Sequence, residues 1–458
     1  MNYLTEVVYL IASVLFILGL KGLSHPETAR RGMHFAEIGM LLAIIGTLVN
    51  GHIVTWTWII TGVAIGSAIG AAMAIFMPMT AMPQRIALSH AFGALAAVLV
   101  GINEYIEKGA HAELSNFLMG AIGFEVLFGA LTVTGSLMAF GKLSELIKSA
   151  PITYKGQNFI NITLFFTAFG MFIYLIFFPY NATIFYVMIA LAFLIGIFIV
   201  LPIGGADMPV VISLMNSYAG LAIAATGFAI DNKVLIIAGS LDGASGFILS
   251  IIMSQAMNRS FTNVLFGAVG SSQVDSSALA EERPITRVGI EDTKFILEQA
   301  DRVVVVPGYG MAVAQAQHTV RELSDELDKH GIAVEFAIHP VAGRMPGHMN
   351  VLLAEANISY DQLLEMETIN PTMDSVDVCI IIGANDVVNP AARTDKSSPI
   401  YGMPIIDVDK ARTVIVMKRS MAAGFAGIEN PLFYEPNTKM LFGDAKKILQ
   451  ELVAEFKK

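Results

Sequence analysis

Nine apolar segments, each long enough to cross a lipid bilayer, fill the first 256 residues and constrain the fold more than any other feature. A span needs about 20 mostly apolar residues, and short gaps make neighbouring spans antiparallel. The segments lie near 4–22, 34–51, 54–77, 86–104, 116–141, 158–178, 182–201, 208–229 and 233–256. We therefore expect a polytopic α-helical membrane domain over residues 1–256, embedded in a lipid bilayer.

The loops between these segments carry positive charge unevenly. One set of alternating loops contains only Lys108 and Lys233. The other set contains Lys21, Arg30, Arg31, Arg85, Lys142, Lys148, Lys155 and Arg259. Because loops rich in Lys and Arg stay in the cytoplasm, we expect the N-terminus outside and the C-terminal half in the cytoplasm.

The composition changes near Asn258. Residues 257–458 hold 19 Lys or Arg and 27 Asp or Glu, against 9 and 11 in residues 1–256. This acidic surplus argues against nucleic acid as a partner. We interpret 257–285 as a linker and 286–458 as a soluble domain. Cys379 is the only cysteine, which excludes an intrachain disulfide and a cysteine metal site, and we expect no metal.

The soluble half contains a glycine-rich turn between a predicted strand and a predicted helix. Arg302–Val306 is a β-branched apolar run typical of a buried parallel strand. It leads into Gly308, Gly310 and Ala314, followed by helical residues to Lys329. Glycines at such a turn allow the backbone to approach a pyrophosphate. The alternative is an ordinary strand–turn–helix.

Further strands and helices alternate along this half. Glu291–Ala300 is a short amphipathic helix candidate. The strand candidates are Ala333–Ile338, Val376–Ile382, Pro404–Val408 and Thr413–Met417. This alternation predicts a soluble α/β doubly wound, Rossmann-like parallel-sheet domain.

Polar residues after the predicted strands favour NADP over NAD. No acid ends the second strand to bond a ribose hydroxyl, whereas Lys418, Arg419 and Ser420 follow Thr413–Met417 and suit a 2′-phosphate. The alternative for these three is a solvated basic strand end. The loop 340–348 could be a lid whose Arg344 meets a phosphate. Asp386 follows another strand, at the ligand-binding edge of the sheet, where it could sense charge or titrate near the nicotinamide. The alternative is that Asp386 forms an Asx-turn or caps a helix.

Polar groups within the apolar segments are costly there and mark candidate sites. His90 and Asn216 enter their spans from the same side of the membrane and could share a depth. Imidazole can carry a proton near neutral pH, and an amide can orient it. Glu125 and Asp242 are further candidates for proton sites. Each of these groups could instead be a hydrogen-bonded interior residue. Asp207 before span eight also fits a helix N-cap.

The chain resembles the β subunit of proton-translocating NAD(P) transhydrogenase over essentially its full length. The segments that carry the resemblance are Gly204–Val210, Met215–Tyr218, Pro307–Gln317, Gly343–Ala354, Gly383–Ala392, Lys418–Met421 and Met440–Asp444.

The resemblance implies a bacterial inner-membrane machine of two subunits. A separate α subunit would bind NAD(H) and add further spans, while this chain would bind NADP(H). Hydride would pass between NADH and NADP⁺, coupled to proton translocation and supplying NADPH. A dimer of αβ units is also implied.

The resemblance also assigns roles to residues. For proton transfer and coupling it implies His90, Asn216, Asp207 and Asp386. For nucleotide binding it implies Gly308, Tyr309, Gly310, Ala312, Val313, Ala314, Gly343, Arg344, Asn385, Asp386, Lys418, Arg419 and Ser420. Two residues depart from the family pattern: Phe425 stands in place of a Tyr, and Asp242 in place of a small uncharged residue.

Two rival functions fit parts of the pattern. A nucleotide-gated ion channel often shows a carbonyl-lined filter such as TVGYG, and residues 1–256 contain none. A membrane-anchored NADP reductase would need only one or two spans. Nine spans with an internal His and Asn disfavour it.

Overall fold

The computed structural model describes residues 3–49, 56–148, 151–204, 207–257 and 284–458, except 346, 397, 399, 423 and 425–427 and the side chains of 26 and 27. Most of the predicted linker 257–285, and Phe425, lie outside these residues. The chain divides into two compact units: Met1–Gly204 with Val210–Ser250, and Gly205–Pro209 with Ile251–Lys458.

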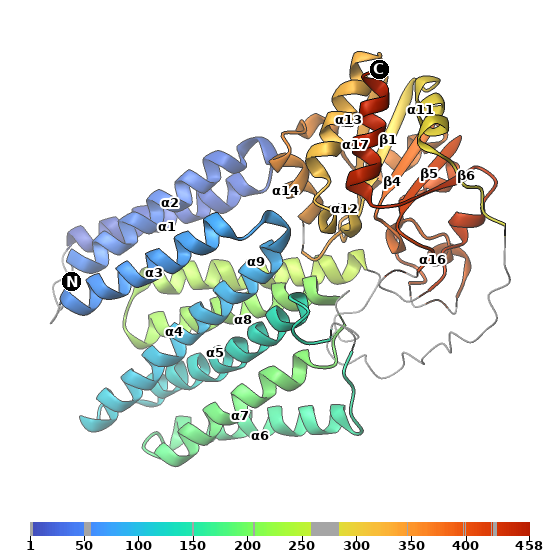
Figure 1. Cartoon of the computed structure of the whole chain (residues 1–458). Helices are drawn as coiled ribbons and strands as arrows, with labels where there is room; N and C mark the ends of the chain where they lie inside the picture. Colours follow the sequence, from blue (N-terminus) through green and yellow to red (C-terminus); the bar gives the residue numbers. More distant parts are fainter. Residues whose placement is uncertain are drawn as a thin grey trace. The chain divides into compact units, whose positions relative to one another are not determined.

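The first unit is a bundle of long helices (Figure 1). Over its described residues, nine helices are long and apolar enough to cross a membrane. They are α1 (Tyr3–Leu23), α2 (Pro26–Val49), α3 (Trp56–Phe76), α4 (Met82–Ala110), α5 (Asn116–Leu143), α6 (Gln157–Phe177), α7 (Ala182–Val200), α8 (Met208–Ala229) and α9 (Lys233–Ala256). Each helix coincides with one predicted span, so the prediction of about nine spans is confirmed.

Small residues allow the helices of this bundle to pack closely. Helix α5 packs against α4, α6 and α7, while α1 packs against α2. At Gly196 on α7, an added Cβ would lie 2.2 Å from the Leu131 carbonyl oxygen on α5, so only glycine fits. Backbone contact of this kind is how membrane helices associate, because lipid offers no hydrophobic driving force between them.

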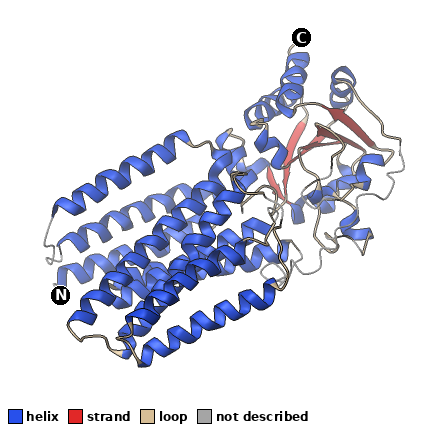
Figure 2. Ribbon diagram, turned by 60° about the horizontal axis from the view of Figure 1, so that its bottom comes forward, coloured by secondary structure: helices blue, strands red, loops and turns tan. Residues whose placement is uncertain are grey.

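The second unit is built on a six-stranded parallel sheet, red in Figure 2. Its order is β3-β2-β1-β4-β5-β6. The strands are β1 (Arg302–Pro307), β2 (Ala333–Ile338), β3 (Leu363–Glu365), β4 (Val378–Ile382), β5 (Thr413–Lys418) and β6 (Thr438–Phe442). The helices are α11 (Ile290–Glu298), α12 (Tyr309–Val313), α13 (Gln317–Lys329), α14 (His348–Glu355), α15 (Met366–Ile369), α16 (Ala391–Thr394) and α17 (Ala445–Phe456).

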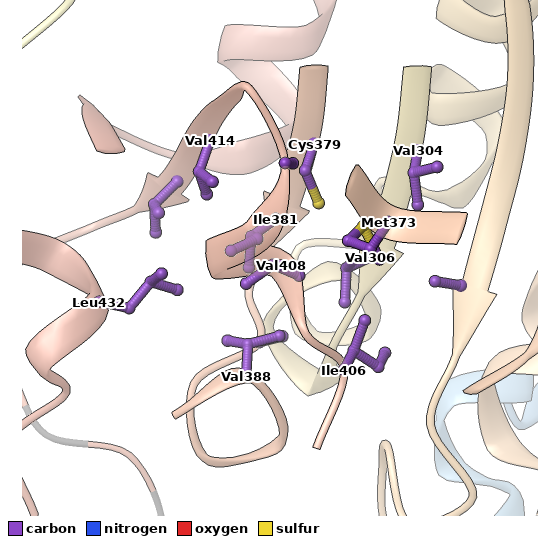
Figure 3. Close-up of a cluster of buried hydrophobic side chains, with 14 of the residues drawn as sticks. Val304, Val306, Met373, Cys379, Ile381, Val388, Ile406, Val408, Val414 and Leu432 are labelled. Atoms are coloured by element: carbon purple, nitrogen blue, oxygen red, sulfur yellow. The ribbon is translucent and has the colours of Figure 1, made fainter. Parts of the chain in front are cut away.

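Both faces of the central strands are buried, as parallel sheets require. Figure 3 shows the core on one face, where Val304, Cys379 and Val414 come from the three central strands. Helices α11, α13 and α17 pack together in the same unit (Figure 1). Burial raises the pKa of the Cys379 thiol, so this cysteine is an inert core residue.

Three details differ from the sequence prediction. The prediction of a strand at Pro404–Val408 is wrong: the segment is irregular, although Ile405, Ile406 and Val408 are buried. Strands β3 and β6 were not predicted. The helix expected from the glycine turn to Lys329 is interrupted between α12 and α13, where Gln315 has a φ of +49°.

Candidate functional site

The carboxyl ends of the strands gather the predicted nucleotide residues at one edge of the sheet. The chain reverses direction across the sheet between β1 and β4, the two central neighbours. In open parallel sheets ligands bind at this switch point, outside the carboxyl ends of the strands. The predicted nucleotide-binding residues lie in the segments that follow β1, β2 and β4, and at the end of β5 with the loop after it.

The glycine turn after β1 packs directly on the loop after β4. The Gly308 amide donates to the Ile382 carbonyl at 2.9 Å, and the Gly310 amide donates to the Gly383 carbonyl at 2.9 Å. A Cβ on Gly308 would lie 2.4 Å from the Cα of Ala384. Because Gly308 has a φ of −125°, its need for glycine comes from this contact and not from an unusual backbone.

The remaining residues of the turn have different environments. Ala312 is fully buried, Val313 is 51% exposed and Ala314 is half-buried at the end of α12. Close packing at this turn therefore falls more on Ala312 than on Ala314.

The loop after β2 brings Arg344 to the glycine turn. The Arg344 guanidinium lies 4.3 Å from the centre of the Tyr309 ring, and Arg344 is 6% exposed. The Arg344 amide donates to Nδ1 of His348 at 3.0 Å. Burial, and then the nearby Arg344 charge, lower the pKa of His348 to about 4, so this imidazole is neutral at pH 7.

The loops after β4 and β5 also meet. Asn385 donates from its side chain to Asp386 at 3.3 Å, and Asn430 donates to the Asn385 carbonyl at 3.1 Å. Burial lowers the pKa of Lys418, and the charge of Asp386 opposes this effect. The Lys418 ammonium donates to the Ala422 carbonyl and lies 4.6 Å from the centre of the Phe433 ring.

Arg419 and Ser420 follow Lys418 and are both exposed. A guanidinium and a hydroxyl accessible at a strand end can receive a phosphate group. A cavity of about 480 Å³ lies elsewhere, beside α16, and none of the predicted nucleotide-binding residues lines it.

Two histidines of this unit were missed by sequence reasoning. His339 is buried, and its Nε2 lies 2.8 Å from the Pro404 carbonyl oxygen while its Nδ1 accepts from the Val341 amide at 3.2 Å. Burial lowers the pKa of His339, so it is a neutral link between two loops. His348 gave a weak signal, because it ends the Gly- and Pro-rich loop that contains Arg344.

The membrane unit brings His90 of α4 and Asn216 of α8 together. Asn216 is the hydrogen-bond partner of the His90 ring, and Nδ1 of that ring has no partner among the described residues. The Asn216 amide nitrogen also donates to Oδ1 of Asp242 on α9, at 3.1 Å.

The other polar groups considered in residues 1–256 have surroundings of their own. Glu125 on α5 is fully buried and accepts from the Thr226 hydroxyl at 2.6 Å. Asp207 is buried and directly precedes α8. Lys142, expected in a cytoplasmic loop, instead ends α5 as a fully buried side chain, and its ammonium donates to the carbonyls of Leu201 and Ile203.

These features define a class: a multi-pass membrane protein that carries a Rossmann-like domain. The family model of the NAD(P) transhydrogenase beta subunit matches residues 5–455. The chain is 48% identical over 468 aligned positions to the NAD(P) transhydrogenase subunit beta of Rhodospirillum rubrum, which covers 98% of each protein. The sequence from a named strain of that species gives the same values.

The chain therefore belongs to the NAD(P) transhydrogenase beta subunit family, and the resemblance drawn from its sequence is confirmed. Membership makes it an oxidoreductase subunit whose family acts on NAD(H) and NADP(H). The name of the subunit implies an alpha subunit as its partner.

Proposed function

We propose that this chain binds NADP(H) and exchanges hydride with NADH bound on a partner α subunit, coupled to proton translocation across a bacterial inner membrane. In this proposal residues 1–256 translocate protons, 257–285 link the domains and 286–458 bind NADP(H). The observation that carries it is a dinucleotide-type strand order with a glycine turn at its switch point, in one chain whose described residues form nine helices long and apolar enough to cross a membrane.

The residues at the sheet edge fit a dinucleotide phosphate. Gly308, Gly310 and Gly383 keep the backbone of the two central loops close and free of side chains. Lys418, Arg419 and Ser420 would hold the 2′-phosphate, with Arg344 and Tyr309 covering the turn. The nicotinamide supplies or accepts the hydride when the nucleotide is bound. The protein contributes binding, orientation and exclusion of water.

His90 is the proposed proton carrier of the membrane domain. It is an ionisable side chain within a predicted span, and such groups line ion pathways by default. Asn216 would orient the ring, so that proton uptake and release occur in a defined geometry. Nδ1 is a buried ring nitrogen with no hydrogen-bond partner in the part of the chain that the structure describes, and it is available to accept or deliver a proton.

Coupling would arise from two states of the nucleotide domain with different proton affinities. Protonation at His90 would shift the loops that carry Asp386 and Arg344, with Asp207 transmitting the change before α8. An occluded state would permit hydride transfer, and an open state would permit nucleotide exchange. A ligand shifts such an equilibrium only by its differential affinity for the two states.

The assembly and orientation complete the proposal. We place the N-terminus outside and the nucleotide domain in the cytoplasm, since the Lys- and Arg-rich loops lie on that side. Two αβ units would form the functional dimer. The physiological product would be NADPH.

Nucleotide titration of the purified full-length chain tests the binding half of this proposal. NADPH should bind much more tightly than NADH. Arg419→Gln should weaken the binding of NADPH by about 1.5–3 kcal/mol and leave the binding of NADH unchanged. Lys396→Gln removes an exposed cation of the same domain and serves as the control. Equal affinities for the two nucleotides would contradict the assignment of NADP(H) to this chain.

A further inference from the structure

Asp242 is the one member of the polar cluster in the membrane unit to which the proposed function gives no role. Its carboxylate oxygen Oδ1 accepts from the Asn216 amide nitrogen at 3.1 Å. Asn216 in turn is the hydrogen-bond partner of His90. Three polar side chains from α4, α8 and α9 thus form a chain in which Asn216 is the middle member.

The contact between α8 and α9 fixes the position of Asp242. A Cβ on Gly220 would lie 2.3 Å from the Gly243 amide nitrogen, so the two backbones touch there. The Ser217 hydroxyl donates to the Gly243 carbonyl at 2.8 Å. A Cβ on Gly246 would lie 2.8 Å from the Asn216 amide nitrogen. The residues beside Asn216 and Asp242 are therefore locked together, which holds the pair in register.

Several charged groups of the surrounding helices are bonded to other residues. Glu125 is bonded to Thr226, and Lys142 to two carbonyls. Lys233, at the start of α9, pairs with Glu6 at 2.9 Å. The remaining titratable groups on α4, α8 and α9 are Arg85, Glu104, Tyr105, Glu107, Lys108 and Tyr218. Among the described residues, the polar side-chain partner of both His90 and Asp242 is Asn216, and none of these groups acts on either side chain.

An ionised carboxylate can only accept hydrogen bonds, whereas an amide has one donating and one accepting end. Asp242 therefore draws the nitrogen of Asn216 toward itself and leaves the amide oxygen to its other partner. An oxygen facing His90 accepts from a ring N–H. The same amide nitrogen also donates to the backbone carbonyl of Asp242, at a longer 3.5 Å. Any residue at position 242 keeps that contact, so the carboxylate adds the shorter of the two bonds that orient the amide.

We propose that Asp242 is a positioning residue for proton uptake at His90. It orients the Asn216 amide and adds a negative charge to the cluster, and both effects favour the protonated ring. No proton need reside on Asp242 for this role. The inference rests on the proposed function, and it gives the carboxylate of Asp242 a role in proton transfer through the membrane unit.

The test uses vesicles that contain the full chain and its NAD-binding partner, and follows proton-coupled hydride transfer across pH. Asp242→Asn keeps the size of the side chain and removes the charge, while Asp242→Ser removes the charge with a smaller side chain that fits the same space. Asp242→Glu restores a carboxylate. Asp231→Asn is the matched control, because it removes an exposed carboxylate at the end of the same helix pair.

As the pH is raised, we expect turnover to fall in both neutral variants at a pH on the order of one unit below that at which it falls in the wild type. Without the carboxylate, the His90 ring takes up its proton less readily. Asp242→Glu should return the profile toward that of the wild type, and Asp231→Asn should leave it unchanged. If the wild type couples hydride transfer to proton movement and both neutral variants keep its pH profile, the role of Asp242 is disproved. A wild type that shows no proton movement would overturn the proposed function and this inference together.

Discussion

Buried neutral histidines make the stability of the nucleotide domain depend on pH. His339 and His348 are 2% and 0% exposed, and burial lowers the pKa of both. The unfolded chain takes up a proton on each ring as the pH falls through about 6.5. The folded state does not, because His348 titrates only at about 4. Stability present above pH 6.5 is therefore lost progressively as the pH falls toward 4.

The first prediction concerns His348→Asn, whose amide oxygen can replace Nδ1 as acceptor for the Arg344 amide. In the wild type, the neutral His348 should lower the free energy of unfolding by about 2 kcal/mol when the pH falls from 7 to 5. The variant should lose this dependence, so its melting temperature should fall by about 4–8 °C less over that interval. Thermal unfolding in detergent at both pH values measures the difference.

His318→Asn is the control for this experiment, since His318 is an exposed imidazole in the same domain. It should keep the pH dependence of the wild type. An equal fall in melting temperature for His348→Asn and the wild type would contradict the assignment of acid sensitivity to His348.

The second prediction concerns Gly308→Ala. The new methyl group would meet backbone atoms of Ala384 at 2.4 Å, and backbone cannot rotate away as a side chain would. We expect a loss of stability of about 1–3 kcal/mol and weakened NADPH binding, because the two central loops must separate. Thermal unfolding and NADPH titration measure the two effects.

Gly289→Ala provides the matched control, because its Cβ would meet only the Asp292 carboxylate at an ordinary 3.6 Å. It should leave both measurements near the wild type. Wild-type binding by Gly308→Ala would show that the loops after β1 and β4 need not touch for nucleotide binding.

Single residues show both what sequence reasoning can find and what it misses. The pattern around Gly308 identified the turn, because a glycine pair between a strand and a helix is a local signal. The function of those glycines in packing against Gly383 and Ala384 is not local, since the two loops are more than 70 residues apart in the chain. Pairings such as Asn216 with Asp242 depend in the same way on which helices meet.

At the scale of elements, the ends of α5 and α7 are joined by one side chain. Lys142 lies at the end of α5 and donates to the carbonyls of Leu201 and Ile203 at 2.5 and 2.7 Å. These groups follow α7, where the last carbonyls of a helix lack partners within it. Lys142 therefore caps a neighbouring helix, although the sequence placed it among the positively charged residues of the loops expected in the cytoplasm.

The third prediction follows from this cap. Lys142→Met keeps the length and apolar stem of the side chain and removes a donor from both carbonyls, although the Leu201 carbonyl keeps the Ile152 amide as a donor. We expect a loss of at least about 2 kcal/mol in the free energy of unfolding. Unfolding in mixed micelles measures it, with Lys148→Met as the control because Lys148 is exposed. Equal stability of the two variants would contradict the capping role.

Helices and strands were predictable from the sequence where the apolar residues follow one clear pattern, and they were less predictable elsewhere. Apolar length predicted each of the nine long apolar helices found in the described residues. Helix α4, however, extends from Met82 to Ala110, beyond the apolar run of 86–104 that predicted it. The segment 404–408 is apolar and buried, yet Pro404 has no amide donor and the Ile406 amide bonds to the Val387 carbonyl. Strand β3 has only three residues, too short for an alternation to show.

At the scale of the whole molecule, the chain joins a bundle of membrane helices to a nucleotide fold. Membership of the transhydrogenase beta subunit family explains why the two occur together. Each unit contributes one chemical capability to the proposed function: a histidine that can carry a proton, and a sheet edge that can hold NADP(H). Neither capability alone would couple hydride transfer to proton translocation.

The most direct test of this account is proton movement in vesicles that contain the full chain and its NAD-binding partner, supplied with NADPH and an oxidised NAD analogue. We predict an uncoupler-sensitive change of internal pH that follows hydride transfer in the wild type and is lost in His90→Ala. Full proton-coupled turnover by His90→Ala would contradict the account. Nucleotide binding with ion leak and no hydride transfer would favour a nucleotide-gated channel instead.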